Sequence, residues 1–342
     1  MEKLKIIQIG ICHEHAAGKW ATLKKHPDLF DLIGYVDERD FCKTPWLHQF
    51  FNADLYADHR KLTLDEALNY PGLEAVTVEV PNNDLVPVAL KCMEHDLPMH
   101  MDKPAGEDLA LYKKLLDGCK EKKLPFQMGY MFRGNPAFQF CIRAIREKLI
   151  GDVFEIEADM NHCYGNEIYQ EYLGKFPGGI MYNLGCHLID FAAAAMGRPD
   201  NVTSFLKSAP GYPDQVRNNC MAVLEYPHAL VTLRSCSKDA CNTGGRAMKI
   251  AGTKGTIKFS PIERFDGRSV EIELTMSEDN GLFPKGVHTL RFPPQRDRYE
   301  VQLIQLMKEI RGEVPPAGNY DHDYLVHEIT LAAASYITWR KN

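Results

Sequence analysis

The sequence predicts an α/β protein of two domains, in which a parallel-sheet domain precedes an α+β domain with a large open, mostly antiparallel or mixed sheet. Three observations support this fold class. The length of 342 residues corresponds to roughly two domains of ~150 residues each. Short apolar runs alternate with helical patterns in the first third of the chain, whereas β-rich segments dominate after Val153. The hydrophobic content of 45% and the charged content of 25% are typical of a globular protein with a sizeable core.

Four apolar runs in the first domain predict parallel strands, because helical patterns separate them in the manner of βαβ units. These runs are residues 5–9, 32–36, 75–80 and 98–101. One helix is predicted at 16–25 and another from Glu107 onward. The second helix has an apolar face whose members recur at steps of three and four, namely Leu109, Tyr112, Leu115, Leu116 and Cys119.

A further strand over 126–131 and a helix that begins at Pro136 lead into the second domain. The helix carries one apolar face and ends at Gly151; that face consists of Phe138, Ile142, Ile145 and Leu149. We therefore expect the first domain to span residues 1–125 and the second 126–342, with the C-terminal helices able to pack back on the first.

The second domain contains β-rich segments that predict an antiparallel or mixed sheet. They are residues 154–159, 202–207, a hairpin over 220–235, and a second hairpin over 248–259. Such a sheet needs a cover on one face. Helical patterns that can supply it occur at 191–196, 298–311 and 324–339.

Charge and composition exclude several classes of function. The net charge is -6 and no basic run is present, so the electrostatic footprint of a nucleic-acid binder is missing. The longest apolar stretch, 191–196, is far below the ~20 residues that cross a bilayer. The ten cysteines are scattered without a C-x-x-C pair, and the N-terminus resembles no signal peptide, so we expect a cytoplasmic protein without disulfides.

The first strand ends at Gly10, where a dinucleotide-binding G-x-G-x-x-G turn belongs in a Rossmann-type domain. Cys12 and His15 occupy the places of the second and third glycines. The helix that follows still offers free N–H groups and a positive dipole end to a phosphate. We therefore expect Gly10, Cys12, His13 and His15 to contact a dinucleotide.

Asp37 closes the second strand, where a carboxylate can bind both hydroxyls of an adenosine ribose and repel a 2′-phosphate. No lysine or arginine follows it directly. This position favours NAD over NADP, although an aspartate that merely starts a turn is an equally valid interpretation of the position alone.

Asp102, Lys103 and Pro104 follow the strand at 98–101, at the sheet edge where α/β proteins bind ligands. A lysine there can donate to an alcohol oxygen and stabilise the negative charge that develops on it during hydride transfer. The alternative is an ordinary solvated loop lysine.

The densest group of candidate residues lies between Gly178 and Asp190. On a helix, Asn183, His187 and Asp190 are spaced by four and three residues and share a face. Histidine can accept an alcohol proton near neutral pH, and a neighbouring amide or carboxylate can hold its ring. A buried, hydrogen-bonded histidine without a catalytic role is the alternative.

These motifs, in this order and over nearly the whole chain, resemble the glucose-fructose oxidoreductase / inositol dehydrogenase / MocA (Gfo/Idh/MocA) family. The resemblance rests on Gly10 to His13, Asp37, Val80-Pro81-Asn82, Asp102-Lys103-Pro104, and Gly178 to Asp190. It implies a dinucleotide-binding domain, a second domain with a large open sheet, and oxidation of sugars, polyols or related cyclic alcohols with NAD or NADP. It also implies that Lys103 is the lysine of the family's Glu-Lys-Pro motif and that His187 is the catalytic histidine.

The resemblance adds further expected contacts. Pro81, Asn82 and Asp102 join the cofactor-binding residues. The substrate-binding residues are expected to be Lys103, Arg133, Tyr164, Asn183 and His187. The sequence departs from the family pattern at two of these residues: Asp102 replaces a glutamate, and Asn183 replaces an aspartate. The second change alters the chemistry, because an amide cannot take up a proton as a carboxylate does.

We expect an NAD-dependent dehydrogenase acting on the CH–OH group of a sugar or cyclic polyol, with catalytic Lys103, His187 and Asn183. Two alternatives stay open: an enzyme that keeps NAD bound and cleaves a glycosidic bond by transient oxidation and elimination, and a non-catalytic sugar-sensing module. We expect no metal, because His13, Glu14 and His15 are too close in sequence to converge on an ion. We expect a homodimer or homotetramer formed through the C-terminal sheet.

Overall fold

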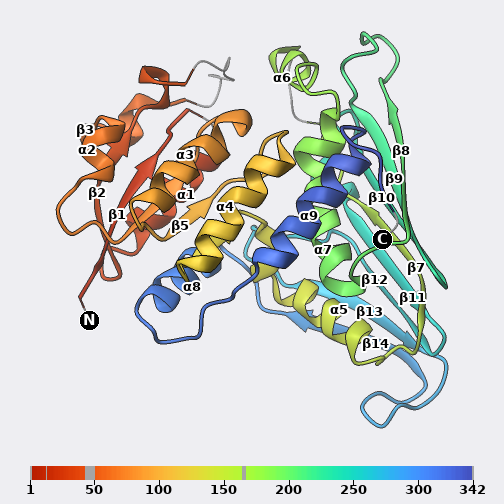
Figure 1. Cartoon of the computed structure of the whole chain (residues 1–342). Helices are drawn as coiled ribbons and strands as arrows, with labels where there is room; N and C mark the ends of the chain where they lie inside the picture. Colours follow the sequence, from red (N-terminus) through yellow and green to blue (C-terminus); the bar gives the residue numbers. More distant parts are fainter. Residues whose placement is uncertain (1, 13, 43–50, 164–166, 341–342) are drawn as a thin grey trace. The chain divides into compact units, whose positions relative to one another are not determined.

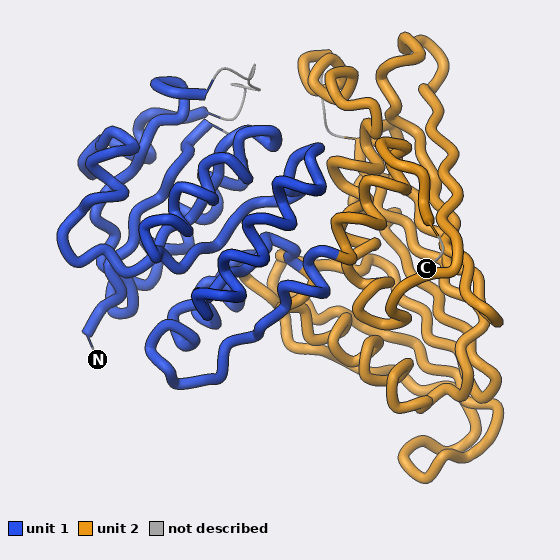
Figure 2. Tube along the Cα trace, in the orientation of Figure 1, with its two compact units in different colours: residues 1–131, 297–324 blue, residues 132–296, 325–342 orange. Residues whose placement is uncertain are grey.

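The computed structural model describes residues 2–12, 14–42, 51–163 and 167–340. The chain divides into two compact units (Figure 2). Unit 1 comprises residues 1–131 and 297–324, and unit 2 comprises residues 132–296 and 325–342. Each unit contains one sheet and its own helices (Figure 1).

Unit 1 is built on a six-stranded sheet with the order β3-β2-β1-β4-β5-β6, in which every pair of neighbouring strands is parallel. The strands are β1 (Leu4–Ile9), β2 (Phe30–Val36), β3 (Arg60–Leu62), β4 (Ala75–Val78), β5 (Met99–Met101) and β6 (Phe126–Met128). The chain runs outward from β1 to β3 and then returns to β4 beside β1. This reversal is the switch point at which open α/β sheets bind ligands, so the fold confirms the predicted Rossmann-type domain.

The helices of unit 1 are α1 (Glu14–Lys25), α2 (Leu64–Leu68), α3 (Asn82–Glu94), α4 (Leu109–Glu121) and α8 (Glu300–Ile310). Strand β4 is wholly buried, as expected of a parallel sheet with both faces covered. The buried face of α4 is the predicted one. Helix α8 arrives from far along the chain, and its Leu303 packs with Leu4, Leu23 and Phe30 in one apolar cluster.

Unit 2 is built on an eight-stranded sheet with the order β14-β13-β12-β11-β7-β10-β9-β8. The strands are β7 (Val153–Asp159), β8 (Asn201–Lys207), β9 (Asn219–Tyr226), β10 (Ala229–Cys236), β11 (Ala247–Gly252), β12 (Gly255–Phe259), β13 (Val270–Met276) and β14 (Gly286–Phe292). Strands β7 and β10 pair in parallel, and the other neighbours are antiparallel. The sheet is therefore mixed and mostly antiparallel, as predicted.

The helices α5 (Pro136–Arg146) and α7 (Cys186–Met196) lie on one face of this sheet (Figure 1), together with α6 (Glu167–Leu173) at one end. Helix α5 begins at Pro136, and Asn135 caps it by accepting from the Ala137 N–H at 2.9 Å. None of the helices described in unit 2 lies on the opposite face, which explains why buried and exposed residues alternate along β10 and β13.

Several elements differ from the sequence prediction. Strands β3, β13 and β14 and the short helices α2 and α6 were not identified, although β13 alternates Val, Glu, Ile, Glu and Leu from Val270 onward. Helix α9 (Tyr320–Ala333) begins and ends earlier than the predicted range of 324–339. It stops because Ser335 adopts φ +59° and the Tyr336 N–H donates to the Leu331 carbonyl at 2.8 Å, a left-handed C-terminal cap. None of the described helices is long and apolar enough to span a membrane.

Candidate functional site

Gly10, which directly follows β1, can only be glycine. Its φ is +104°, and a Cβ atom there would lie 2.3 Å from the carbonyl oxygen of Glu79. The ends of β1 and β4 therefore approach each other more closely than a side chain allows. In place of the second glycine of the fingerprint, Cys12 is fully buried. His13 lies outside the described residues.

A buried carboxylate stabilises the turn after Gly10. Glu38 accepts hydrogen bonds from the backbone N–H groups of Ile11 at 2.8 Å and Cys12 at 3.0 Å. Burial raises the pKa of Glu38, and these backbone hydrogen bonds oppose that rise. Glu38 was not predicted from the sequence as a residue of this site, and its carboxylate fixes the turn through these two backbone hydrogen bonds.

Asp37 lies at the end of β2 and is held by two cations. Arg39 donates to it from Nε at 2.8 Å and from Nη2 at 2.6 Å, and Lys61 Nζ lies 3.3 Å from Oδ2. Burial by itself would raise the pKa of Asp37, but the hydrogen bonds from Arg39 and Lys61 lower it below the usual value. Lys61 lies close to Asp37 because β3 pairs with β2, and this contact could not be predicted from the sequence.

The next two strand ends carry Pro81, Asn82, Asp102 and Lys103. Pro81 caps the N-terminus of α3, and Asn82 is the first residue of that helix. Asp102 and Lys103 follow β5 and are each 5% exposed. Lys103 is thus a buried lysine at the carboxyl edge of the sheet and not a solvated loop residue.

Asp102 belongs to a group of ionisable side chains that we call the Lys19 cluster: the buried Lys19, Glu79 and Asp102, and the partly buried His15. Lys19 Nζ lies 2.7 Å from Glu79 Oε1 and 3.1 Å from Asp102 Oδ1, and His15 Nδ1 lies 3.0 Å from Asp102 Oδ2. Lys19 and Glu79 were not among the residues predicted from the sequence. A signal existed, because Lys19 occupies the spacing of the buried face of α1 formed by Ala16, Lys19, Trp20 and Leu23.

In unit 2, Asn183 and His187 lie on a π-helical turn and on the α-helix that continues it. Asn183 falls in a π-helical turn, Met181–Gly185, which continues into α7 with His187 in its first turn. Such turns occur often at functional sites. Asn183 is half-buried and accepts a hydrogen bond from the Tyr169 hydroxyl at 3.5 Å. His187 is 3% exposed, and its ring lies edge-on to Phe132 at 5.8 Å between centroids.

Asp190, the third residue of the predicted helix face, forms an ion pair with Arg133. The guanidinium donates from Nη2 to Asp190 Oδ1 at 2.7 Å and from Nε to both carboxylate oxygens at 3.0 and 3.2 Å. Arg133 therefore has a structural partner in addition to any substrate contact. Tyr164, the other expected substrate-binding residue, lies outside the described residues.

A polar network that was not predicted from the sequence anchors α6 beside Asn183. The Tyr169 hydroxyl lies 3.4 Å from Nε2 of the fully buried His162. Gln170 is the next residue of α6, and its Oε1 accepts from Asn218 Nδ2 at 3.0 Å and from the Ser237 hydroxyl at 3.1 Å. These polar side chains are far apart in sequence, so no local pattern revealed them.

Among the residues that the structure describes, Cys12, Asp37 and Glu38 offer potential metal-ligand atoms within 4.8 Å of one another. Arg39 and Lys61 already bind the Asp37 carboxylate. Backbone N–H groups bind the Glu38 carboxylate. These contacts account for the cluster without an ion.

Comparisons with known proteins find one matching family profile and several oxidoreductases of low sequence identity. The family profile described as the GFO/IDH/MocA C-terminal domain matches residues 138–258. The uncharacterized oxidoreductase YhhX of Escherichia coli is 27% identical over 157 residues, which are 46% of this chain and 45% of that protein. The D-apiose dehydrogenase of Paraburkholderia graminis is 22% identical over 218 residues, which are 62% of this chain and 56% of that protein. The chain spans about half the length of these curated relatives.

Solved structures share the fold over both units. An NAD binding oxidoreductase from Klebsiella pneumoniae has a TM-score of 0.78 and 15% identity, covering 99% of this chain and 100% of its own. An oxidoreductase from Agrobacterium radiobacter, solved with NAD+, L-tartaric acid and magnesium, has a TM-score of 0.77 and 18% identity, covering 98% and 96%. These likenesses show the fold that the chain shares with both structures. Within unit 2, residues 138–258 are similar to the C-terminal domain of the GFO/IDH/MocA family.

Proposed function

We propose that this protein is an NAD-dependent oxidoreductase that transfers a hydride between nicotinamide and the CH–OH group of a sugar, cyclic polyol or related alcohol. In this proposal residues 1–125 bind the dinucleotide and residues 126–342 bind the substrate. The observation that carries it is the buried Lys103 at the carboxyl edge of the unit 1 sheet, two strands from a turn whose Gly10 admits no side chain. The profile match over residues 138–258 and the NAD+ complex of a solved structure with the same fold support it.

The residues at this edge fit a dinucleotide. Gly10 keeps the strand end free of a side chain, and the N-terminus of α1 follows it closely, where a pyrophosphate finds free N–H groups. Asp37 keeps its negative charge because Arg39 and Lys61 lower its pKa, and an ionised carboxylate binds ribose hydroxyls. NAD, when bound, supplies the hydride acceptor. The cofactor-binding residues would be Gly10, Cys12, His13, His15, Asp37, Pro81, Asn82, Asp102 and Lys103.

The side chains proposed to act on the substrate have separate tasks. Lys103 donates a hydrogen bond to the alcohol oxygen and stabilises the charge that builds there. His187 accepts the hydroxyl proton as a general base. Asn183, held by Tyr169, orients the substrate or the imidazole. The remaining proposed substrate contacts are Arg133 and Tyr164.

The test is binding followed by turnover. Isothermal titration of the purified protein with NAD and with NADP measures both dissociation constants, and we expect tighter binding of NAD. A panel of sugars and polyols is then assayed for NADH formation. Absence of NAD binding, or turnover of no alcohol in the panel, would reject the proposed function.

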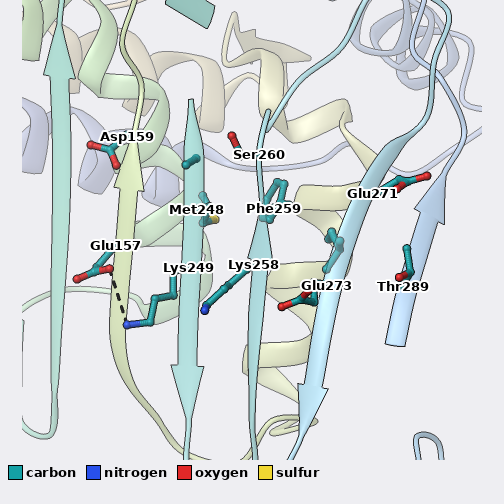
Figure 3. A pocket seen from close by; sticks show the side chains of 12 residues that line it. Glu157, Asp159, Met248, Lys249, Lys258, Phe259, Ser260, Glu271, Glu273 and Thr289 are labelled. Carbon is teal, nitrogen blue, oxygen red and sulfur yellow. Dashed lines mark ion pairs between the residues drawn. The ribbon is translucent and has the colours of Figure 1, made fainter. Parts of the chain in front are cut away.

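We further propose that a second copy of the chain covers the open face of the unit 2 sheet in a homodimer or homotetramer. Apolar side chains on these strands stay exposed, among them Leu230 at 55% and Val287 at 65%. A groove of about 610 Å³ crosses the same sheet, lined by Lys249, Lys258 and Glu273 among others (Figure 3). Mixed charge and exposed apolar area are typical of self-association. Analytical ultracentrifugation tests this, since Leu230→Asp should shift the protein toward monomer and the loop variant Leu282→Asp should not.

A further inference from the structure

The Lys19 cluster joins three segments of unit 1 at the carboxyl edge of its sheet. Glu79 directly follows β4, Asp102 directly follows β5, and Lys19 reaches both from α1. The Asp102 main chain is also tied to β4, because its N–H donates to the Val78 carbonyl at 3.0 Å. The neighbour of Asp102 is Lys103, the residue that the proposed function places on the alcohol oxygen.

Each N–H donor of the Lys19 ammonium has a carboxylate oxygen within hydrogen-bond distance. Its three N–H donors face three carboxylate oxygens: Glu79 Oε1 at 2.7 Å, Glu79 Oε2 at 2.9 Å and Asp102 Oδ1 at 3.1 Å. Lys19 and Glu79 are both fully buried. The two carboxylates raise the pKa of Lys19 despite its burial, so the ammonium is charged.

The space around the cluster is closed on further sides. A Cβ atom at Gly129, after β6, would lie 3.1 Å from Asp102 Oδ1 and 3.3 Å from Lys19 Nζ. The Tyr299 ring lies 5.4 Å from Lys19 Nζ, and it packs so closely on α1 that a Cβ at Gly18 would meet it at 2.5 Å. The charged groups facing Lys19 are thus Glu79 and Asp102, with His15 on the far side of Asp102. In so full a site the ammonium determines where the Asp102 carboxylate lies.

We propose that Lys19 is a positioning residue: by binding Asp102 and Glu79 together it holds the Asp102–Lys103 segment and the adjoining strand end in the geometry that the reaction needs. A buried ion cluster adds little net stability compared with apolar packing of the same volume, so its value lies in specifying one arrangement. The proposal rests on the proposed function for its catalytic meaning. It also makes a structural claim about residues 102–106 that is independent of turnover.

The first test replaces Lys19 with methionine, which removes the charge and keeps an unbranched side chain that is one heavy atom shorter. We expect kcat and kcat/KM for the alcohol to fall together, on the order of 10²-fold, because misplacement of a catalytic group by about 1 Å has that effect. Hydrogen exchange of the amides in residues 102–106 should accelerate. The matched control is Lys24→Met on the same helix, whose ammonium pairs at the surface with Asp58. In this control kcat, kcat/KM and the exchange rate of residues 102–106 should all stay at their wild-type values.

The double variant Lys19→Met/Glu79→Gln distinguishes two causes of a lower kcat: loss of the position of residues 102–106, and destabilisation by an unpaired buried carboxylate. It removes the buried carboxylate that Lys19→Met leaves without a cation, so the melting temperature should recover while kcat stays low and exchange stays fast. Recovery of kcat to the wild-type value in the double variant, or wild-type kcat with unchanged exchange in Lys19→Met, would overturn the positioning role. If the wild-type protein binds no NAD and turns over no alcohol, the proposed function fails, and the exchange measurement still decides whether Lys19 holds residues 102–106.

Discussion

The candidate residues of the two units are held in different ways. In unit 1 the carboxylates at the strand ends are bound by charged partners at short range: Asp37 by Arg39 at 2.6 Å, and Glu79 by Lys19 at 2.7 Å. In unit 2 the contact from Tyr169 to the Asn183 amide is neutral and measures 3.5 Å. The charged pair of that helix lies further on, where Arg133 binds Asp190 at 2.7 Å.

This difference separates two tasks. Charge-assisted contacts are shorter and about twice as strong as neutral ones, so the strand ends of unit 1 are arranged before any ligand arrives. The amide of Asn183 and the imidazole of His187 lie on a π-helical turn and the helix that continues it. Unit 2 is therefore where small changes in side-chain chemistry should alter the reaction without disturbing the fold. The following substitutions test that view.

The largest effect is expected for His187→Ala. Loss of a positioned general base should lower kcat by about 10²–10⁴-fold, as measured by steady-state formation of NADH. His228→Ala, in the exposed turn between β9 and β10, is the matched control and should retain wild-type activity. An active His187→Ala enzyme would assign the proton transfer to another group.

Lys103→Ala should follow, with a loss of about 10²–10³ in kcat, or roughly 2.7–4 kcal/mol of transition-state stabilisation. The dissociation constant for NAD should change little if Lys103 acts on the alcohol oxygen. Lys113→Ala, which removes an exposed ammonium paired with Asp117, is the control. Near-normal kcat in Lys103→Ala would remove this residue from the mechanism.

Asn183→Asp introduces a charge into the neutral region of unit 2 with almost no change in shape. A nearby carboxylate favours imidazolium, so the acidic limb of the pH–rate profile should move to higher pH, while the maximal rate stays within about tenfold of wild type. The profile of kcat/KM against pH measures this. An unmoved limb would mean that Asn183 is not coupled to His187 and contacts a substrate hydroxyl instead.

Asp37→Ala should have the smallest effect. Arg39 and Lys61 lose their anionic partner and become available to a 2′-phosphate, so the preference for NAD over NADP should shrink by about 1 kcal/mol, roughly fivefold. Titration with both cofactors measures the ratio. An unchanged ratio would make Asp37 an ordinary turn residue.

Much of the fold followed from local pattern. The four short apolar runs that predicted the parallel sheet appear as β1, β2, β4 and β5, because a buried parallel strand needs continuous apolar residues. The strand predicted over 126–131 was assigned to the second domain, but its residues 126–128 form β6 of the unit 1 sheet. The alternation in β13 was equally local but was not recognised. The end of α9 depended on Ser335 adopting a left-handed conformation, which residue type alone does not predict.

The sequence by itself determined which chemical groups stand at the strand ends: Gly10, Asp37 and Lys103 each follow an apolar run that was recognisable without coordinates. Only the tertiary structure decided their partners. Lys19 meets Glu79 and Asp102, 60 and 83 residues away. Lys61 lies next to Asp37 because β3 pairs with β2. Arg133 binds Asp190, which is 57 residues away in the sequence. The physical reason is that burial makes an unpaired charge costly, yet which opposite charge lies within reach depends on strand order and helix packing, which arise only when the chain has folded.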